Sequence, residues 1–413
     1  MTNNNLSFNS NKEISTGRST WLMRLALLLG VVGVLVPSMW LFQKFMQTEF
    51  AKSITQRSNV EFAGYNFGPG GISSSDGGSS IPVGNGSSGV SGRLPVGNSG
   101  GTSALKGGVN SSPGTTTVFK SQCLARSGQK VIVPGLQKQA YGNYSLRANT
   151  VIDASSARWD GTTSNGVPIA WAIIVQGLGP SCWYGGNYNG AWDDTNPAVT
   201  WQNSYHHSGG LTIRVPDFLV ESLRVNNQGD GVRMESAGSN FFIRGVHLSN
   251  IHDDCIENDF LHAGTLDDSL LDGCYVGFSA DDHTATLNGS ANTWQITNNL
   301  VYIKRMNTVY TGPKPASGML FKGWYRAGVG PSIILKNNIF MADDKAGLSV
   351  HSSGATLGVP PLANLKNCEN NIFVWLGKGP FPNALPSCFR VTTDASVWNN
   401  AVAQWKNNHP GAR

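Results

Sequence analysis

Three aspartates have the residue type and spacing that a pair of catalytic carboxyl groups requires. Asp230 lies in the segment NQGDG that begins at Asn227, and Asp253 and Asp254 follow 23 and 24 residues later. If the chain stacks these segments, equivalent positions lie about 4.8 Å apart, the spacing of neighbouring strands. Carboxylates that close cannot all ionise freely, so at least one pKa rises. A protonated carboxyl beside an ionised one can cleave a glycosidic bond, because one protonates the leaving oxygen and the other activates water.

The acid-rich segment that contains the last two aspartates also indicates a calcium site. Oxygen ligands from neighbouring coils can hold Ca²⁺, and the candidate ligands are Asp253, Asp254 and Glu257. Further acids in the same stretch are Asp259, Asp267, Asp268, Asp272, Asp281 and Asp282. No EF-hand-like spacing is present, so a solvated acidic face is the alternative. Calcium is therefore the one cofactor that the sequence leaves open.

Histidines and basic residues near these acids are further candidates. His283 directly follows two aspartates and His252 precedes one, and imidazole titrates close to neutral pH. Lys304, Arg233 and Arg244 are the basic residues expected near the acidic face. We take His283 and Lys304 as candidate catalytic residues. Each has the alternative of an ordinary turn or surface residue, and Asp-Gly and Asp-Asp are themselves common turn dipeptides.

A repeat of 23 residues predicts the elements that position these side chains. Val225, Leu248 and Leu271 are spaced at this interval, as are Ile243 and Leu266. Each unit consists of short alternating runs broken by Gly, Asn and Asp, without a helical period. We therefore expect an all-β fold, a right-handed single-stranded parallel β-helix. Asn at the repeated turns tolerates left-handed dihedral angles and can stack in ladders.

The two ends of the predicted solenoid differ in sequence. Asp394 can cap a short C-terminal helix whose Val397, Ala401 and Trp405 share one face, and this helix is a candidate cap for the last coils. Residues 118–210 are irregular and contain four tryptophans: Trp171, Trp183, Trp192 and Trp201. We expect these rings to pack over the first coils, and sugar stacking is the alternative.

Over roughly residues 210–375 the chain resembles the right-handed parallel β-helix superfamily of pectate lyases and polygalacturonases. Residues 149–154, NTVIDA, resemble an opening coil of such proteins. The segments CIEND at 255–259 and FRVTTD at 389–394 also resemble uncharacterised bacterial β-helix proteins. The resemblance implies the fold and a site on one face of the coils.

Within that superfamily, polygalacturonases carry Asn-x-Asp-Gly and, one coil later, Asp-Asp-Cys, which residues 227–231 and 253–255 resemble. The resemblance implies that Asp253 is the general acid and that Asp230 and Asp254 activate water. The nearest match to the family's Arg-Ile-Lys is YIKR at 302–305, which includes Lys304, and its Gly-His-Gly is absent. Pectate lyases instead bridge enzyme and acidic sugar with calcium and use an Arg base.

The N-terminal quarter of the chain predicts a membrane anchor and a linker. Residues 25–43 carry no charge and reach roughly 28 Å as a helix, about the thickness of a bilayer core. We expect a cytoplasmic tail at 1–20, an uncleaved transmembrane signal anchor at 21–43, a disordered Gly/Ser-rich linker at 44–117 and the β-helix domain at 118–413. A cleaved signal peptide is the competing interpretation.

Composition and cysteine usage indicate where this domain works. The net charge of +5 comes without Lys/Arg clusters, so nucleic acid is not an expected partner. All six cysteines lie after residue 118 without a C-x-x-C pair, which favours disulfides in an oxidising compartment. We therefore expect a single-pass membrane protein with a periplasmic or extracellular domain, and the sequence leaves its oligomeric state open.

Two functions fit these features. A membrane-tethered β-helix with paired carboxylates can act on a cell-envelope or extracellular polysaccharide, as a hydrolase or a lyase. The same fold can also serve as a non-enzymatic, adhesin-like scaffold that binds glycans. The state of the three aspartates distinguishes them: an enzyme needs carboxylates of perturbed pKa beside a cleft, whereas a scaffold ties them to backbone N–H groups at turns or leaves them solvated.

Overall fold

The computed structural model describes residues 119–412, except 194, 197, 202, 283–285, 307–318, 325–327, 344–360 and 383. The predicted tail, transmembrane helix and linker lie outside the described residues, as does His283. Among the described helices, none is long and apolar enough to cross a membrane.

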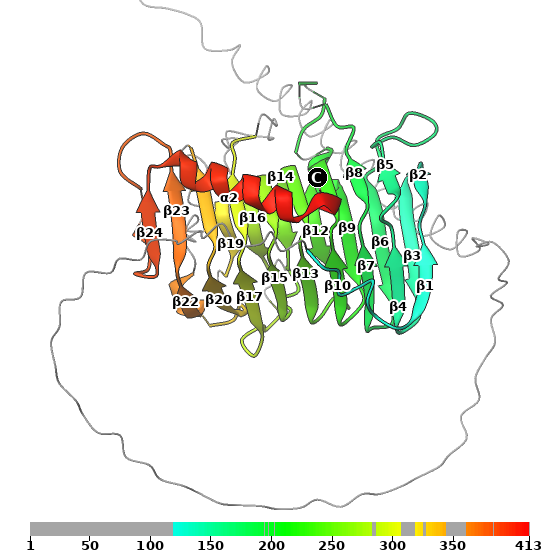
Figure 1. The fold of residues 1–413 in the computed structure, drawn as a ribbon, viewed down its shortest axis with the longest axis horizontal. Helices are drawn as coiled ribbons and strands as arrows, with labels where there is room; N and C mark the ends of the chain where they lie inside the picture. The colour runs from blue at the N-terminus through cyan, green and yellow to red at the C-terminus, as the bar shows by residue number, and fades with distance from the viewer. Residues whose placement is uncertain are drawn as a thin grey trace, which may run out of the picture. The chain divides into compact units, whose positions relative to one another are not determined.

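Successive parallel strands form three ladders that run along a β-helix-like solenoid (Figure 1). The strands of ladder A form a nine-stranded sheet: β1 (Gln129–Ile132), β4 (Thr150–Asp153), β7 (Ser181–Tyr184), β10 (Phe218–Glu221), β13 (Phe241–Arg244), β15 (Gly264–Asp267), β17 (Thr293–Thr297), β20 (Ser332–Lys336) and β22 (Leu365–Glu369).

Ladders B and C share one fifteen-stranded sheet. Ladder B contains β2 (Gly135–Gln137), β5 (Ala157–Trp159), β8 (Asn187–Asn189), β11 (Arg224–Gln228), β18 (Leu300–Ile303), β21 (Ile339–Ala342), β23 (Asn371–Trp375) and β24 (Phe389–Thr392). Ladder C contains β3 (Tyr141–Leu146), β6 (Trp171–Gly177), β9 (Gly209–Arg214), β12 (Asp230–Met234) and β19 (Met319–Gly323). The long strands β14 (His247–Glu257) and β16 (Leu270–Ala280) pass from ladder B to ladder C and join them.

The predicted repeat is confirmed by the register of these strands. Val225 pairs with Leu248, and Leu248 pairs with Leu271, so the three side chains stack in one column. The column continues through Val301 to Phe340, and all its members are buried. Each coil therefore places its apolar side chains on those of the next, which explains the all-β fold. The handedness of the coil stays a prediction.

Asparagines hold the corners of the coils, as the sequence predicts. Asn227, Asn250, Asn298 and Asn337 have φ between 49° and 59°, the left-handed region. A second set of asparagines is buried and stacks through side-chain hydrogen bonds: Asn299, Asn338 and Asn371. The turns therefore repeat their side-chain contacts from coil to coil, just as the strands do.

The C-terminal helix α2 (Ala395–Asn408) lies along the outside of ladder B rather than over the last coil (Figure 1). Asp394 caps it, as predicted, by accepting a hydrogen bond from the Ser396 amide at 2.9 Å. Trp398 and Trp405 pack on a small apolar cluster of strands β16 to β23. The helix covers the side of the sheet because its apolar face packs on the outward-facing apolar side chains of these strands and buries them.

Three disulfides use all six cysteines: Cys123–Cys182, Cys255–Cys274 and Cys368–Cys388. This confirms the prediction of disulfide bonding and indicates an oxidising environment. The first bond ties the segment that enters the solenoid to β7, three strands into ladder A.

Candidate acidic site

The structure brings the three predicted aspartates together at the corner between ladders B and C. Asp230 begins β12, and a register shift in β14 between Ile251 and Asp254 turns Asp253 and Asp254 towards it. One carboxylate oxygen from each lies within 4.8 Å of the other two. The Asp254 amide also donates to Asp230 Oδ1 at 3.3 Å. We call Asp230, Asp253 and Asp254 the acidic cluster.

Two cations from ladder C balance this charge. Lys322 Nζ lies 2.8 Å from Asp254 Oδ2, and Arg233 lies 3.7 Å from Asp230 Oδ2 and 3.4 Å from Glu257 Oε2. Arg233 pairs with Glu257 in the register, and Glu257 connects through Ser279 to Lys322. These residues therefore form one column of polar side chains beside the acidic cluster.

Burial dominates the electrostatics of the site. It raises the pKa of Asp230 to about 6, and the Asp253 carboxylate acts in the same direction. It raises the pKa of Asp254 well above its usual value, although the Lys322 ammonium opposes this. The pKa of Glu257 rises for the same reason, and its carboxyl group shares a hydrogen bond with that of Asp230. Asp230 and Glu257 therefore hold a proton between them at mildly acidic pH.

Aromatic side chains border the acidic cluster on its exposed side. His206 Nδ1 lies 3.6 Å from Asp253 Oδ2, and the His206 ring packs on Trp201. The half-buried Trp171 lies beside Gly209, where an added Cβ would stand 2.8 Å from the indole ring. Arg233 lies over the same indole, 5.7 Å from its centroid. Trp171, Gly209 and Asp230 share one register position, so this partly exposed indole lies two strands from Asp230.

A separate pocket of about 300 Å³ opens around the corner, on the ladder B side. It is lined by Asn226, Asn227, Asn250, His252, Lys304, Arg305 and Met306. Lys304 donates to Asn250 Oδ1 at 3.1 Å, and His252 stacks on Tyr205. Burial lowers the pKa of His252 to about 3, and Lys304 adds to that effect, so this imidazole is neutral. Lys304 thus belongs to a polar, cationic pocket and does not contact the acidic cluster.

The predicted calcium ligands are divided by the structure. Asp253 and Asp254 group with Asp230, whereas Glu257 contacts Arg233 and Asp230. The Lys322 ammonium already neutralises Asp254, so a calcium ion there would have to displace it. The donor set thus fits the ammonium better than Ca²⁺, and we derive no step through a metal.

Other acids of the same segment have roles within the fold. Asp259 Oδ1 accepts from the Ser279 hydroxyl and the Asp281 amide. Asp267 Oδ1 accepts from Thr297 and Asn298. Asp268 and Asp272 contact residues at the C-terminal end of the chain, His409 and Lys406. The acid-rich segment is therefore distributed over several faces.

The sequence did not single out Lys322 or His206. Lys322 is 68 residues from Asp254 and stands in an apolar run, so neither its spacing nor its neighbours marked it. His206 follows Tyr205 in a short 3-10 turn (Tyr205–His207), a local structure with no repeat. Of the basic residues expected near the acids, Arg233 lies beside them, whereas Arg244 pairs with Glu221 on ladder A.

Comparison of the chain with protein families, curated proteins and solved structures finds no match.

Proposed function

We propose that this protein is a membrane-tethered, exported β-helix that cleaves an extracellular or cell-envelope polysaccharide by hydrolysis at the acidic cluster. The observation that carries the proposal is the grouping of Asp230, Asp253 and Asp254 within 4.8 Å, with burial raising the pKa of Asp230 and Asp254. Perturbed carboxyl groups at a strand corner are typical of acid–base sites.

In this proposal the proton that burial retains on the acidic cluster passes through Asp253 to the leaving oxygen, and the carboxylates of Asp230 and Asp254 then orient the attacking water. Asp253 suits the first role because it faces His206, whose side chain is 43% exposed, on the open side of the cluster. Lys322 suits Asp254 to the second role because the ammonium favours the ionised carboxylate. One oxygen of each carboxyl group lies within 4.8 Å of the other two, at the short end of the roughly 5–9.5 Å separations of glycosidase carboxyl groups. In this proposal the scissile bond approaches from the Asp253 side, because Asp253 faces the partly exposed His206.

The surroundings favour an acidic glycan as the substrate. The pocket around the corner carries Lys304 and Arg305 and a neutral His252, which suit a carboxylate-bearing sugar. Trp171 offers an indole for a ring on the other side. Successive coils repeat their spacing along the solenoid, which matches an extended polymer.

A non-enzymatic glycan-binding scaffold is the second candidate. It is favoured by the hydrogen bond from the Asp254 amide to Asp230 and by the Lys322 contact, since both also stabilise the turn. The two candidates make different predictions for one substitution, because a scaffold retains its function without the Asp253 carboxyl group.

The test compares the full chain with Asp253→Asn and with a control, Asp160→Asn, whose exposed side chain lies 4.0 Å from Arg158. Acidic and neutral glycans are supplied with calcium and then with chelator, and reducing ends and unsaturated uronate absorbance are followed separately. We expect reducing ends from the parent and the control, and a loss of roughly 10²- to 10⁴-fold in Asp253→Asn.

Other results would redirect the assignment. Unsaturated product that disappears with chelator would replace the hydrolase by a calcium-dependent lyase. Glycan binding by all three proteins without any product would favour the scaffold. Neither binding nor product would leave the polysaccharide proposal without support.

A further inference from the structure

The first coil leaves an open strand edge at the N-terminal end of the solenoid. Within the described residues, β1 pairs only with β4, β2 only with β5 and β3 only with β6. Each of the three ladders therefore ends in a strand whose second side pairs with no strand of the described part of the chain. Such an edge presents backbone N–H and C=O groups that can accept another strand.

In β1 the open backbone groups and the outward side chains belong to the same residues. The amides of Gln129 and Val133 donate to carbonyls of the second coil, at Asn149 and Asp153. In a parallel strand the N–H and C=O of one residue point to the same side and alternate along the chain. The backbone groups of Lys130 and Ile132 therefore point to the open side.

The side chains at this edge are more apolar than an ordinary exposed surface. Ile132 is 70% exposed, Leu136 42% and Tyr141 47%, whereas all four residues of the interior strand β10 are buried. Val133 belongs to the core and Val131 packs against it, so Ile132 points away from the interior. A partner strand beside β1 would cover this isoleucine.

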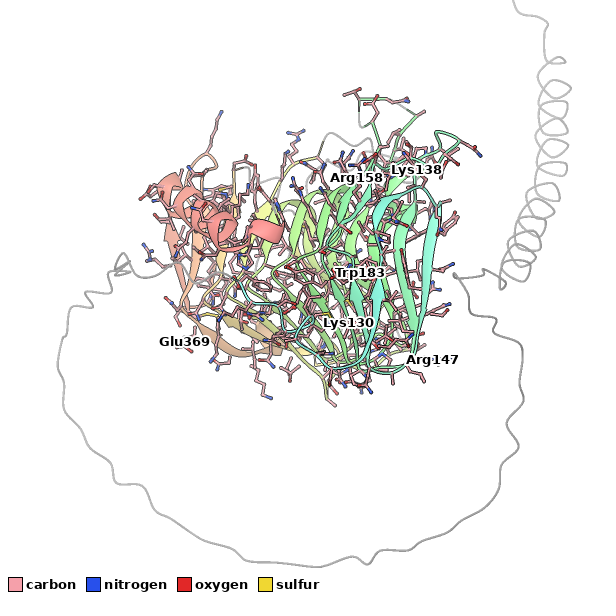
Figure 2. The ribbon with its side chains drawn as sticks, turned by 45° about the vertical axis from the view of Figure 1, so that its right-hand side comes forward. Lys130, Lys138, Arg147, Arg158, Trp183 and Glu369 are labelled. Atoms are coloured by element: carbon pink, nitrogen blue, oxygen red, sulfur yellow. A yellow bond between two sulfur atoms is a disulfide. The ribbon has the colours of Figure 1, made fainter. Side chains whose placement is uncertain are left out.

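The same end of the solenoid is basic. Residues 124–147 contain Arg126, Lys130, Lys138 and Arg147 and no acid. Figure 2 shows Lys130, Lys138 and Arg147 around the strands of this end, with Glu369 near the other. Lysines on an open edge oppose pairing with a like-charged strand.

A second copy of this chain does not complement the edge. Its last coils carry Lys366, Lys378 and Arg390 against Glu369 and Asp394, so head-to-tail stacking would bring the basic first coil against a second surface of net positive charge. Like charges placed opposite one another across strands are destabilising. The edge therefore selects a partner of the opposite charge.

We propose that the open edge of β1 binds an extended acidic segment of a partner protein by strand addition, with an acidic side chain opposite Lys130 and an apolar one beside Ile132. A strand uses the backbone groups of Lys130 and Ile132, which an anionic polysaccharide or a lipid surface leaves unpaired. This interaction surface is independent of the acidic cluster, which lies in later coils of the solenoid.

The test uses the full chain and two labelled seven-residue peptides, one alternating valine with glutamate and the other valine with lysine. We expect the glutamate peptide to bind in fluorescence anisotropy and the lysine peptide not to bind. Lys130→Glu should weaken binding roughly tenfold or more, because it replaces an attraction by a repulsion. Lys366→Glu at the opposite end is the matched control and should bind like the parent.

A second variant tests the backbone. Ile132→Pro removes an N–H group on the open side and leaves the pairing with β4, so it should also abolish peptide binding while circular dichroism stays unchanged. Equal binding of both peptides, no binding by the parent, or unchanged binding by Lys130→Glu would overturn the proposal. A molecular mass that doubles with concentration in the parent but not in Lys130→Glu would overturn it in favour of self-association.

Discussion

The contact between Lys322 and Asp254 shows how single residues set the charge of the site. Both side chains are largely buried, and their atoms lie 2.8 Å apart. Burial acts to lower the pKa of Lys322, but the Asp254 carboxylate holds it above its usual value. The Lys322 ammonium contacts Asp254, whereas Arg233 contacts Asp230 and Glu257, whose carboxyl groups share a hydrogen bond. The carboxyl groups of the site therefore contact different cations, and burial raises the pKa of each of the three.

Replacing Lys322 by methionine should destabilise the protein at neutral pH. The substitution leaves Asp254 buried without its cation, which costs about 3–5 kcal/mol in comparable pairs. The deficit should shrink as the pH falls, because the folded variant holds Asp254 protonated and retaining that proton costs less at low pH. Urea unfolding at pH 7 and pH 4.5 measures both effects. Lys336→Met is the control, since its pair with Glu369 is exposed and should contribute less than about 1 kcal/mol.

The raised pKa of Asp230 makes the stability depend on pH in a defined direction. Its pKa is about 6 in the folded protein and 3.8 in the unfolded chain, so the folded state retains a proton that the unfolded state loses. The contribution of Asp230 to the free energy of unfolding is therefore fully present below about pH 4. It falls by roughly 3 kcal/mol as the pH rises to about 6. Asp230→Asn should remove this dependence. Parallel stability curves for parent and variant between pH 4 and 7 would contradict the assignment.

At the scale of elements, stacked side chains hold the turns in register. Asn338 is fully buried, and its Oδ1 accepts hydrogen bonds from the amide and the side chain of Asn299. Its own amide group donates to Ile296 O and Asn371 Oδ1, both at 2.9 Å. One side chain thus joins three coils, and each of its polar atoms is satisfied inside the solenoid.

Asn338→Ala should therefore destabilise the later coils more than a surface turn substitution does. It leaves several buried donors and acceptors unpaired, for a total loss of about 3–5 kcal/mol. The adjacent Asn337 is exposed and has φ +57°, so Asn337→Gly keeps the left-handed turn and should change stability by less than about 1 kcal/mol. Chemical denaturation of both variants gives the comparison, and similar losses would contradict the role of the buried ladder.

At the scale of the whole molecule, the chain enters the solenoid at its side rather than at its first coil. The buried Glu221 accepts hydrogen bonds from Ser121 and from the amide of Cys123, and Cys123 is bonded to Cys182. Phe119 donates its amide to Asn408 O, next to the end of α2. The entering segment and the C-terminal helix therefore hold each other against the middle of the solenoid.

This arrangement predicts how tension on the N-terminal side enters the domain. The Cys123–Cys182 bond closes a loop of sequence separation 59 that contains the first coil, so pulling on the chain before Cys123 does not extend that loop. In single-molecule pulling, the double variant Cys123→Ser, Cys182→Ser should unfold at a lower force than the parent. Its unfolded chain should extend about 200 Å further. The control double variant Cys368→Ser, Cys388→Ser lacks a bond of sequence separation 20. Its unfolded chain should extend only about 70 Å further than that of the parent. Equal lengthening in the two variants would contradict this path of force.

The regular part of the fold and the core of the site could be predicted from the sequence. Val225, Leu248 and Leu271 recur at one interval, and parallel strands stack at one spacing, so the period alone determines which residues meet. An interval one residue longer pairs β12 with β14, Val232 with Ile256, so the repeat also brings Asp230 beside Asp253 and Asp254. The left-handed asparagines and the capped C-terminal helix follow from local preferences that each residue carries by itself.

Only the tertiary structure decided which groups surround those aspartates. Lys322 shares a register position with Ser279 and Glu257, although the intervals between them differ, and from that position its side chain reaches Asp254. Lys304 lies in a different pocket because β14 and β16 pass around the corner between two ladders. A repeat determines contacts only while its length is constant. Where the loops between coils change length, the neighbours of a side chain depend on the packing of the whole solenoid.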